Sequence, residues 1–463
     1  MIEFYNKYFN SNYKSKVNQL TLDIKRLLEI ENIDLINENS IVLDLSLQIN
    51  LDLKTWTEIN SLYNTLYKQK HNISSTLLKF INKTEKNDNS KLKFIDTFAG
   101  CGGLSLGLKN VGFNPILINE IEPKFLESYY FNHCIHIDNY HCCDIKDFSS
   151  DTTLLNREVD LVVGGPPCQG FSMANRQRLI DDPRNILYKN YLELLSNVRP
   201  KFFVMENVKG MMKKSNEILD NFHNILGDEY SIDMVLLNAK NFGIPQNRER
   251  VFVIGSSKKN VSAAQIIEDI KRSSENCKKF NLADALSSLP ELKPKKIKNV
   301  RGIENNDIGY KFKAYKFADS EYLTFTNSKN KTNYLANHTN RYNNDRDLEI
   351  FSRLPQGANS LHYSINDIMP YSSRNHVFKD KYYKLKEQEV CKTITSHMKF
   401  DCNMYIHPTQ PRGLSPREAA RVQTFPDDFV FMGSNNNWYA QIGNAVPVKL
   451  AEAIGKEIIK YII

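Results

Sequence analysis

The sequence lacks the features that mark membrane-spanning and secreted proteins. It has no apolar run near the roughly 20 residues that a membrane helix requires, and its first residues, MIEFYNKYFNSNYKSK, contain no apolar leader segment. Its eight cysteines include no CxxC pair, and the adjacent Cys142 and Cys143 fit neither a zinc site nor a disulfide framework. We therefore expect a soluble protein of a reducing cytoplasm, without a metal site.

Length and charge set only wide limits on the function. The 463 residues exceed the about 100 to 200 residues of an ordinary domain, so we expect two domains. The formal net charge of +8 suits a polyanionic partner, although many proteins with such a charge bind none. Charge alone does not identify the partner.

Short β-type runs alternate with helix-compatible stretches in the middle of the chain. In order, these runs are KFIDTF, PILINE, HCCDI, DLVVGG and FFVMEN. The alternation predicts an α/β fold with a doubly wound, mostly parallel sheet. Ligands of such sheets bind beyond the carboxyl ends of the strands, where Glu120, Asp144, Cys168 and Glu206 are expected.

The chain divides into four segments of different character. Residues 1–90 include the amphipathic stretch KVNQLTLDIKRLLEIE and are predicted to form a helical extension. Residues 91–255 carry the α/β alternation, whereas 256–390 are rich in Lys, Asn, Asp and Tyr and predict an inserted second domain. In 391–463, SPREAARVQTF has the Ser, Pro and Glu of a capped helix start, and an amphipathic helix ends the chain. This last segment is expected to complete the α/β domain.

The loop GGPPCQGFS holds Cys168 behind two prolines. Two prolines fix two φ angles and remove two backbone donors, so the loop is stiff. A lone cysteine is more often a small buried apolar residue, but a rigid mount for one thiol indicates chemistry.

A glycine cluster predicts a ligand at a helix N-terminus. FAGCGGLSLG lets the backbone approach a ligand closely, although Ser105 stands where the dinucleotide fingerprint has its third glycine. Glu120, at the end of the next strand, can accept hydrogen bonds from ribose hydroxyls. Glu120 and Asp144 could equally be helix caps or solvated loop carboxylates.

Six motifs, in order, resemble those of the DNA (cytosine-5)-methyltransferase family of prokaryotic restriction-modification type. FAGCGGLSLG resembles its S-adenosylmethionine loop, GGPPCQGFS its catalytic loop, MENV its target-base carboxylate and QNRERVFVIG its arginine motif. GLSPREAARVQTFPDDF and QIGNAVPVKLAEAIG resemble the two motifs that end the family's chains. The resemblance covers 94–463 around the irregular segment and leaves the first 90 residues unexplained.

The resemblance implies a covalent mechanism. Carbon 5 of an intact cytosine is a poor nucleophile. Attack by the Cys168 thiolate on carbon 6 makes carbon 5 enamine-like, so that carbon 5 can take a methyl group from a sulfonium. By the same resemblance, Glu206 binds the ring nitrogen 3 and the amino group of the base, Arg250 binds its carbonyl, and Arg248 lies near the catalytic loop. Two further residues of that loop are expected to contact nucleic acid, Gln169 and Ser172.

The resemblance also implies an S-adenosylmethionine site. Glu120 is expected at the ribose, and Asp144 with Ile145 at the adenine. Ile121 stands where some members carry an aromatic residue that stacks on the adenine. The full predicted set is Phe98, Ala99, Gly100, Cys101, Gly102, Gly103, Leu104, Glu120, Ile121, Asp144, Ile145, Pro167, Leu187, Asn444 and Val446.

The implied partner is duplex DNA with one cytosine flipped out of the stack, because a buried thiol cannot reach a paired base. Residues 91–255 would be the catalytic and cofactor-binding domain and 256–390 the target-recognition domain, with specificity before about 375. By analogy we expect the modification enzyme of a restriction-modification system in a prokaryotic cytoplasm, with neither a membrane nor an obligate protein partner.

Three alternatives stay open at this point. A tRNA cytosine-5 methyltransferase shares the chemistry but lacks a long recognition insertion. A catalytically silent DNA-binding homologue usually loses the thiol or the carboxylate, and both Cys168 and Glu206 are present. A Rossmann oxidoreductase is disfavoured by the missing third glycine.

Overall fold

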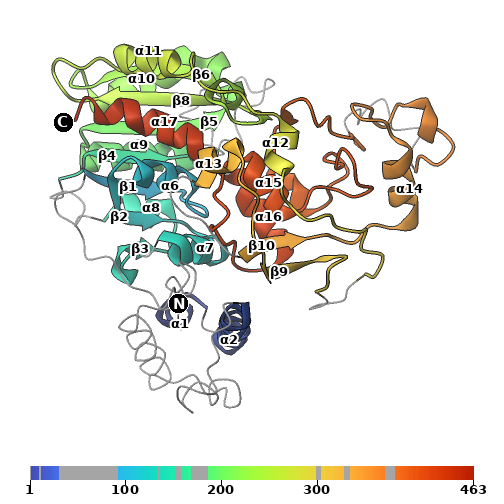
Figure 1. Ribbon diagram of the computed structural model, residues 1–463. Coiled ribbons are helices and arrows are strands. Elements are labelled where there is room, and N and C mark those ends of the chain that lie inside the picture. Colours follow the sequence, from blue (N-terminus) through green and yellow to red (C-terminus); the bar gives the residue numbers. More distant parts are fainter. Residues whose placement is uncertain are drawn as a thin grey trace.

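The computed structural model describes residues 2–9, 12–30, 92–133, 135–151, 158–167, 186–298, 304–327, 334–370 and 381–462. These residues form an α/β body, a second lobe beside it and two N-terminal helices below both (Figure 1). Within these ranges, no helix is both long and apolar enough to span a bilayer. The same ranges hold no group of three or more His, Cys, Asp or Glu side chains that could bind a metal.

The described part of the α/β body is built on a seven-stranded sheet of order β3-β2-β1-β4-β5-β8-β6. Its strands are β1 (Leu92–Thr97), β2 (Phe113–Asn119), β3 (Tyr140–His141), β4 (Leu161–Gly164), β5 (Phe202–Val208), β6 (Ser231–Asn238) and β8 (Glu249–Ser256). Neighbours from β3 to β5 pair in parallel, and β8 runs antiparallel to both β5 and β6. The doubly wound, mostly parallel sheet predicted from the sequence is confirmed.

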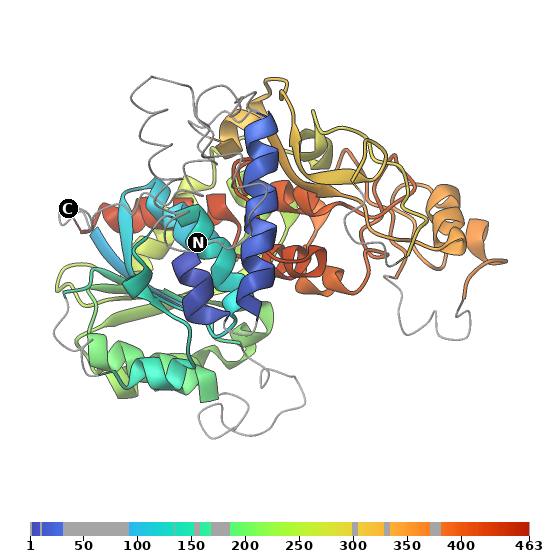
Figure 2. The ribbon, with the colours of Figure 1, turned by 90° about the horizontal axis from the view of Figure 1, so that it is seen from below.

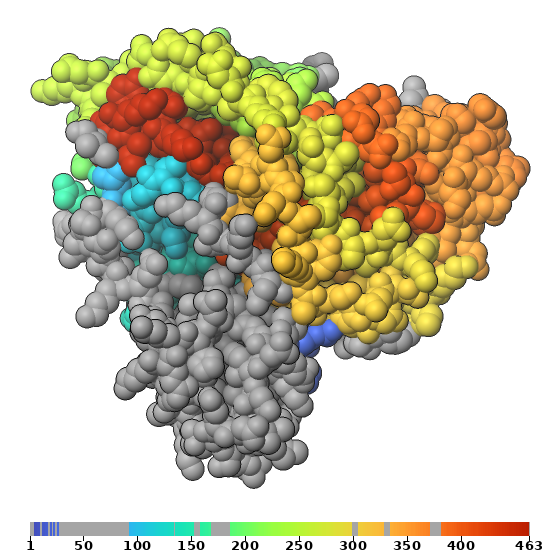
Figure 3. All heavy atoms as spheres, viewed as in Figure 1, coloured from blue at the N-terminus to red at the C-terminus, as the bar shows by residue number. Residues whose placement is uncertain are grey.

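Helices cover both faces of the sheet because alternate strand residues point to opposite sides. On β1, Ile95 belongs to the core beneath α8 (Ile145–Ser149), α9 (Ile186–Val198) and α10 (Ser215–Leu226). Its neighbour Phe94 belongs to the core beneath α6 (Gly103–Asn110), α11 (Ala263–Ser273) and α17 (Val448–Ile459). In the space-filling view the C-terminal α17 lies between α6 and α11 (Figure 3). The end of the chain thus completes the α/β body.

The second lobe, here the described residues from 281 to 434, has little regular structure. It contains α12 (Leu282–Leu286), α13 (Glu321–Asn327), α14 (Asp345–Arg353), α15 (Pro416–Val422) and an antiparallel hairpin of β9 (Gly309–Ala314) and β10 (Tyr334–Thr339). Between lobe and sheet lie α16 (Asn435–Asn444) and a short parallel pair of β7 (Gln246–Asn247) and β11 (Cys391–Lys392). Helix α15 lies in the predicted return segment, 391–463, but it packs on β10, which lies in the predicted second domain, 256–390. The structure therefore does not test the predicted domain boundaries, and they stay predictions.

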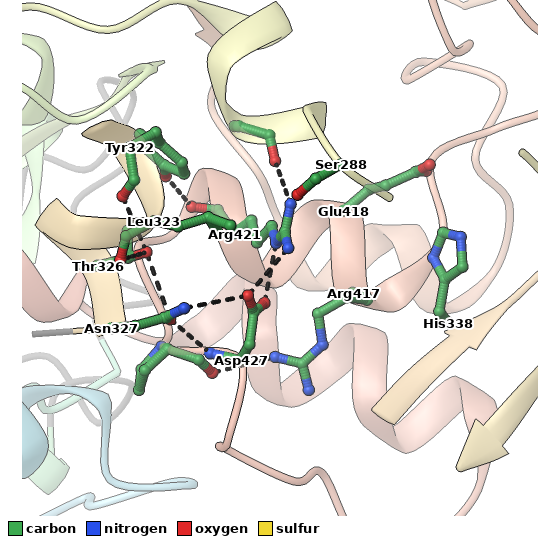
Figure 4. Close-up of polar contacts among 12 residues, drawn as sticks. Ser288, Tyr322, Leu323, Thr326, Asn327, His338, Arg417, Glu418, Arg421 and Asp427 are labelled. Atoms are coloured by element: carbon green, nitrogen blue, oxygen red, sulfur yellow. Dashed lines mark hydrogen bonds and ion pairs between the residues drawn. The ribbon is translucent and has the colours of Figure 1, made fainter. Parts of the chain in front are cut away.

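Helix α15 anchors the second lobe through buried charges (Figure 4). Its N-cap Ser415 forms a capping box with Glu418, as SPRE predicts. Arg421 donates two hydrogen bonds to Asp427, at 2.8 and 2.9 Å, and Arg412 pairs in the same bidentate way with Glu418. All four side chains are buried, so each charge depends on its partner.

Two helices precede the α/β body. They are α1 (Ile2–Tyr8) and α2 (Tyr13–Ile30), which includes most of the predicted amphipathic stretch. The remainder of the predicted extension, 31–90, lies outside the described residues. In the view from below, α2 runs from the α/β body toward the strands of the second lobe (Figure 2).

Candidate active site

A cavity of about 470 Å³ lies at the carboxyl ends of the parallel strands. Thr97 at the end of β1 pairs with Asn119 of β2 on one side and with Gly164 of β4 on the other. The strand order reverses between β1 and β4, which is where open α/β sheets bind their ligands. The segments that follow these strands therefore converge on one place.

The glycine-rich loop after β1 bends through three residues with positive φ, namely Phe98 (53°), Gly100 (57°) and Gly102 (87°). A side chain built at Gly100 would meet nothing within 4 Å, because this backbone faces open space at the cavity. At Gly102 a side chain would instead collide with Tyr129 and His133 of α7 (Pro123–His133). The two glycines thus serve different purposes, a free cavity wall and close packing on α7.

Glu120, directly after β2, fixes this loop. Its Oε2 accepts the backbone N–H of Gly100 at 2.8 Å, and its Oε1 accepts the N–H of Glu122 at 2.9 Å. The side chain is buried, and burial raises the pKa of its carboxyl group above the ordinary value. Each carboxylate oxygen keeps a second lone pair, so Glu120 can still accept hydrogen bonds from a ligand in the cavity.

The segment after β3 forms another wall. The Oδ1 of Asp144 accepts the backbone N–H of Lys146 at 2.9 Å, so Asp144 caps α8 while also lining the cavity. Ile121 is 60% exposed at the rim and offers an apolar face to a flat ring. The cap and the cavity wall are compatible roles for the same aspartate.

The structure brings nearly all of the predicted cofactor residues together. The members of the set that line the cavity are Phe98, Ala99, Gly100, Cys101, Gly103, Leu104, Glu120, Ile121, Asp144, Ile145, Pro167, Leu187, Asn444 and Val446. Gly102 is the exception, because it packs on α7. Asn444 and Val446 come from the end of the chain, which the fold returns to the glycine loop, where the Cys101 thiol lies 3.8 Å from the carbonyl oxygen of Gln441.

At the cavity edge, β5 contributes Glu206. Its Oε1 lies 2.9 Å from Nε of Arg250 on β8, and both side chains are mostly buried, at 14% and 16% exposure. The pair forms because β5 and β8 are adjacent antiparallel strands. The sequence predicts both residues at one site, and the structure places a carboxylate acceptor and a guanidinium donor side by side there.

The proline loop reaches the same cavity. Pro167 lines it, and the Pro166 carbonyl accepts a hydrogen bond from Nδ2 of Asn207 at 2.9 Å. The described part of this loop ends at Pro167, so Cys168, Gln169 and Ser172 lie outside the described residues. Asn207 follows Glu206 directly and thereby links the loop before Cys168 to the strand that carries the carboxylate.

Arg248 does not line the cavity. Its guanidinium is fully buried and donates to the carbonyl oxygens of Ile394, at 2.8 Å, and Gly443, at 3.3 Å. Burial lowers its pKa to about 9, with a smaller contribution from the nearby Arg250 charge. This arginine links α16 and the segment after β11 to the start of β8.

Sequence analysis missed several cavity residues, among them Asp96, Asn119 and Phe125. Asp96 accepts a hydrogen bond from the Ser105 hydroxyl at 2.5 Å, and Ser105 in turn accepts one from Tyr129 at 2.6 Å. Burial raises the pKa of Asp96 to about 7. A signal existed, because Asp96 is the one charged residue within the strand-like run FIDTF.

The charges of the cavity suit a cationic ligand. Among its described lining residues, four carry a carboxyl group (Asp96, Glu120, Asp144 and Glu206), and none is Lys, Arg or His. A ligand with both a positive charge and hydroxyl groups would satisfy these acceptors.

Comparison with known proteins identifies the chain's relatives. Residues 92–460 match the family model described as C-5 cytosine-specific DNA methylase. The chain is 32% identical over 383 residues to type II methyltransferase M1.HphI of Haemophilus parahaemolyticus, with 80% of this chain and 87% of that protein covered. It is 31% identical over 392 residues to M.DdeI of Desulfomicrobium norvegicum, which covers 80% of this chain and 89% of the relative.

Among solved structures, a crystal structure described as a prophage-encoded DNA modification methyltransferase from E. coli is similar to this fold. Its TM-score is 0.61 at 26% identity, and the match covers 80% of this chain and 99% of that one.

Proposed function

The chain belongs to the C-5 cytosine-specific DNA methylase family, and from this membership we propose how it works as a DNA (cytosine-5) methyltransferase. We propose that it transfers the methyl group of S-adenosylmethionine to carbon 5 of a cytosine flipped out of duplex DNA. The observation that carries this proposal is the Glu206–Arg250 pair at 2.9 Å, which lies at the edge of the cavity lined by the glycine loop and Pro167.

The cavity fits this methyl donor. The four carboxyl groups match its positive charges, and the open space beside Gly100 lets the ligand approach the backbone. Glu120 would bind the ribose hydroxyls, while Asp144, Ile145 and the exposed face of Ile121 would hold the adenine. When bound, S-adenosylmethionine supplies an electrophilic methyl group on a sulfonium.

Cys168, Glu206 and Arg250 would act on the base. The Cys168 thiolate would add to carbon 6, and the electron pair of the 5,6 double bond becomes available at carbon 5 for the new bond to the methyl group, whose bond to the sulfonium sulfur breaks and leaves a neutral thioether. Glu206 binds nitrogen 3 and the amino group, drawing electron density from the ring, and Arg250 binds the carbonyl oxygen. Removal of the proton from carbon 5 then expels the thiolate and restores the aromatic ring. The Asn207–Pro166 hydrogen bond supports a fixed approach for the loop that carries Cys168.

We assign Arg248 a positioning role. It holds the carbonyl groups of Ile394 and Gly443, and Gly443 directly precedes the cavity residue Asn444. Arg248 would therefore fix the position of the cavity wall formed by α16 relative to Arg250, which lies two residues further along the chain. Gln169 and Ser172 would contact the DNA beside the catalytic thiol.

The biological setting is proposed from the relatives. Several of them are named type II methyltransferases, so we propose that this enzyme protects DNA within a restriction-modification system, in the cytoplasm of a prokaryote. The second lobe would recognise the target sequence.

The test is transfer of labelled methyl from S-adenosylmethionine to duplex DNA and, in parallel, to tRNA. The proposal expects label in DNA, at carbon 5 of cytosine, and bisulfite sequencing of DNA from expressing cells then reveals the target sequence. Label only in tRNA would establish the alternative substrate, and label in neither would indicate a catalytically silent homologue.

A further inference from the structure

The N-terminal helix α1 is attached to the α/β body at α7. The Phe4 ring stacks on Tyr130 with centroids 4.8 Å apart, and the Tyr5 hydroxyl donates to Glu127 at 2.9 Å. The Tyr8 hydroxyl donates to the carbonyl oxygen of Tyr140 at 2.7 Å. Phe4 and Tyr5 are buried, so α1 packs against the α/β body through a closed interface.

Helix α2 is attached to the second lobe at β9. Asp23 forms an ion pair with Lys311 in which the side chains are only 5% and 11% exposed. Gln19 donates to the other oxygen of Asp23 at 3.0 Å. Arg26 pairs with Glu304, and its guanidinium lies 4.9 Å from the ring centroid of Tyr310. A buried ion pair gives a defined geometry, because either charge alone would be costly to bury.

The two attachments share one hydrophobic core. Residues of α1 and α2 (Phe4, Leu20), of α7 (Tyr130) and of the hairpin (Phe312, Tyr334) belong to a single buried cluster. The helices thus fill the angle between the α/β body and the second lobe, as Figure 2 shows from below. Moving the lobe against the body would expose this shared apolar surface to water.

Helix α2 also contacts α7, the helix that contributes a residue to the lining of the cofactor cavity. Lys16 of α2 forms an ion pair with Glu127 of α7, and Phe125, two residues earlier on α7, lines the cavity. The family match begins at residue 92, so both helices lie outside it. These contacts are therefore an addition to the part of the chain that the family model describes.

We propose that α1 and α2 form a brace that sets the orientation of the second lobe against the catalytic domain, with Asp23 as its main positioning residue. The lobe and the cavity must hold one duplex together, so a lobe without the brace is in the binding-competent orientation for only part of the time, which weakens DNA binding but leaves the bound complex unchanged. This proposal rests on the proposed function only where its test measures DNA methylation.

The test compares Asp23→Asn with wild type in the full-length enzyme. The variant leaves the charge of Lys311 buried without its counter-charge, so hydrogen–deuterium exchange should rise at the backbone amides of β9. The KM for duplex DNA should rise about tenfold, as expected when about a tenth of the molecules hold the binding-competent orientation, while kcat and the affinity for S-adenosylmethionine stay within about twofold. Adding Lys311→Met removes the unpaired charge and should restore both the KM and the protection of β9.

Asp345→Asn is the matched control, because it neutralises an exposed aspartate of the same lobe that pairs with Lys296, and it should change neither readout. If Asp23→Asn does not fold, Gln19→Ala, which removes only the donor to Asp23, is held to the same expectations. Unchanged exchange at β9, or a parallel loss of kcat, cofactor affinity and KM, overturns the brace. Exchange is measured without substrate, so a wild type that methylates no DNA would overturn the proposed function while leaving the brace testable.

Discussion

At the scale of single residues, the protonation state of Asp96 should make ligand binding in the cavity depend on pH. Burial raises its pKa to about 7, so near neutral pH the free enzyme holds a mixture of protonated and ionised Asp96. The folded state binds this proton more tightly than the unfolded chain does, and its stability therefore falls as pH rises from about 4 to about 7. A cationic ligand favours the ionised form, so ligand binding should release a proton.

We predict that the affinity for S-adenosylmethionine rises about tenfold between pH 6 and pH 8 in wild type. Asp96→Asn should flatten this dependence, because no titrating carboxyl group remains at that position. Isothermal titration calorimetry across this pH range measures both. Asp147→Asn, an exposed aspartate near the cavity that does not line it, should keep the wild-type profile. A profile that is flat in wild type, or steeper in Asp96→Asn, would contradict this role of Asp96.

The site residues differ in how far the sequence predicts them. Glu120 and Glu206 were predictable because each ends or follows a recognisable apolar run, and strand ends meet at one edge of a parallel sheet. Asp96 was not predicted, because its hydrogen bond to Ser105 and its burial depend on how α6 turns back over β1. Phe125 enters the cavity only because α7 begins directly beside it.

At the scale of elements, α15 illustrates how buried charges hold the second lobe. Asp427→Asn should lower the free energy of unfolding by about 3 to 5 kcal/mol, since it leaves the buried Arg421 without its counter-charge. Urea denaturation followed by circular dichroism measures this loss. Asp367→Asn, which breaks an exposed pair with Arg353, should leave the denaturation midpoint unchanged.

The same pair predicts a pH dependence. Burial raises the pKa of Asp427, but the charges of Arg421 and Arg417 outweigh burial, so the pKa ends below its ordinary value. The stabilisation is therefore present above about pH 4 and is lost as the pH falls further. Wild type should lose stability more steeply in acid than Asp427→Asn. Equal acid sensitivity of the two proteins would show that this ion pair does not contribute to the pH dependence of stability.

The start of α15 was predictable, but its burial was not. Ser415, Pro416 and Glu418 signal a helix N-terminus by local chemistry alone, and the capping box is present. Arg417, however, donates to the carbonyl groups of Ala336 on β10 and of Phe429 in the loop after α15. A local pattern cannot show which arginine will find such partners.

At the scale of the whole molecule, the second lobe should determine the methylated sequence. We predict that replacing residues 281 to about 375, which leaves α11 in the α/β body untouched, with those of a relative of different specificity changes the methylated site and leaves the reaction unchanged. The exchange must preserve the contacts of β10 with α15, such as that between His338 and Ser415 at 2.9 Å, or the lobe will lose its anchor. Bisulfite sequencing reads the outcome, and an unaltered pattern would move specificity elsewhere in the chain.

The sheet was predictable as a whole because strands and helices alternate regularly from β1 to α10. The second lobe was predictable only as a departure from that alternation, since its hairpin and short helices are held by apolar and polar contacts between residues far apart in the sequence. The placement of α1 and α2 could not be predicted, because it depends on Lys311 and Glu127, far away in the sequence.

The central claim is that Cys168 attacks carbon 6 of a cytosine in DNA. The most direct measurement uses a duplex with 5-fluorocytosine at the methylated position found by bisulfite sequencing, incubated with the enzyme and S-adenosylmethionine. Fluorine at carbon 5 leaves no proton to remove, so the thiolate cannot be expelled and the protein should stay bound to DNA after denaturation in detergent. The account predicts this adduct for wild type and none for Cys168→Ser. A wild type that methylates the normal duplex but forms no adduct, or a Cys168→Ser variant that still forms one, would contradict it.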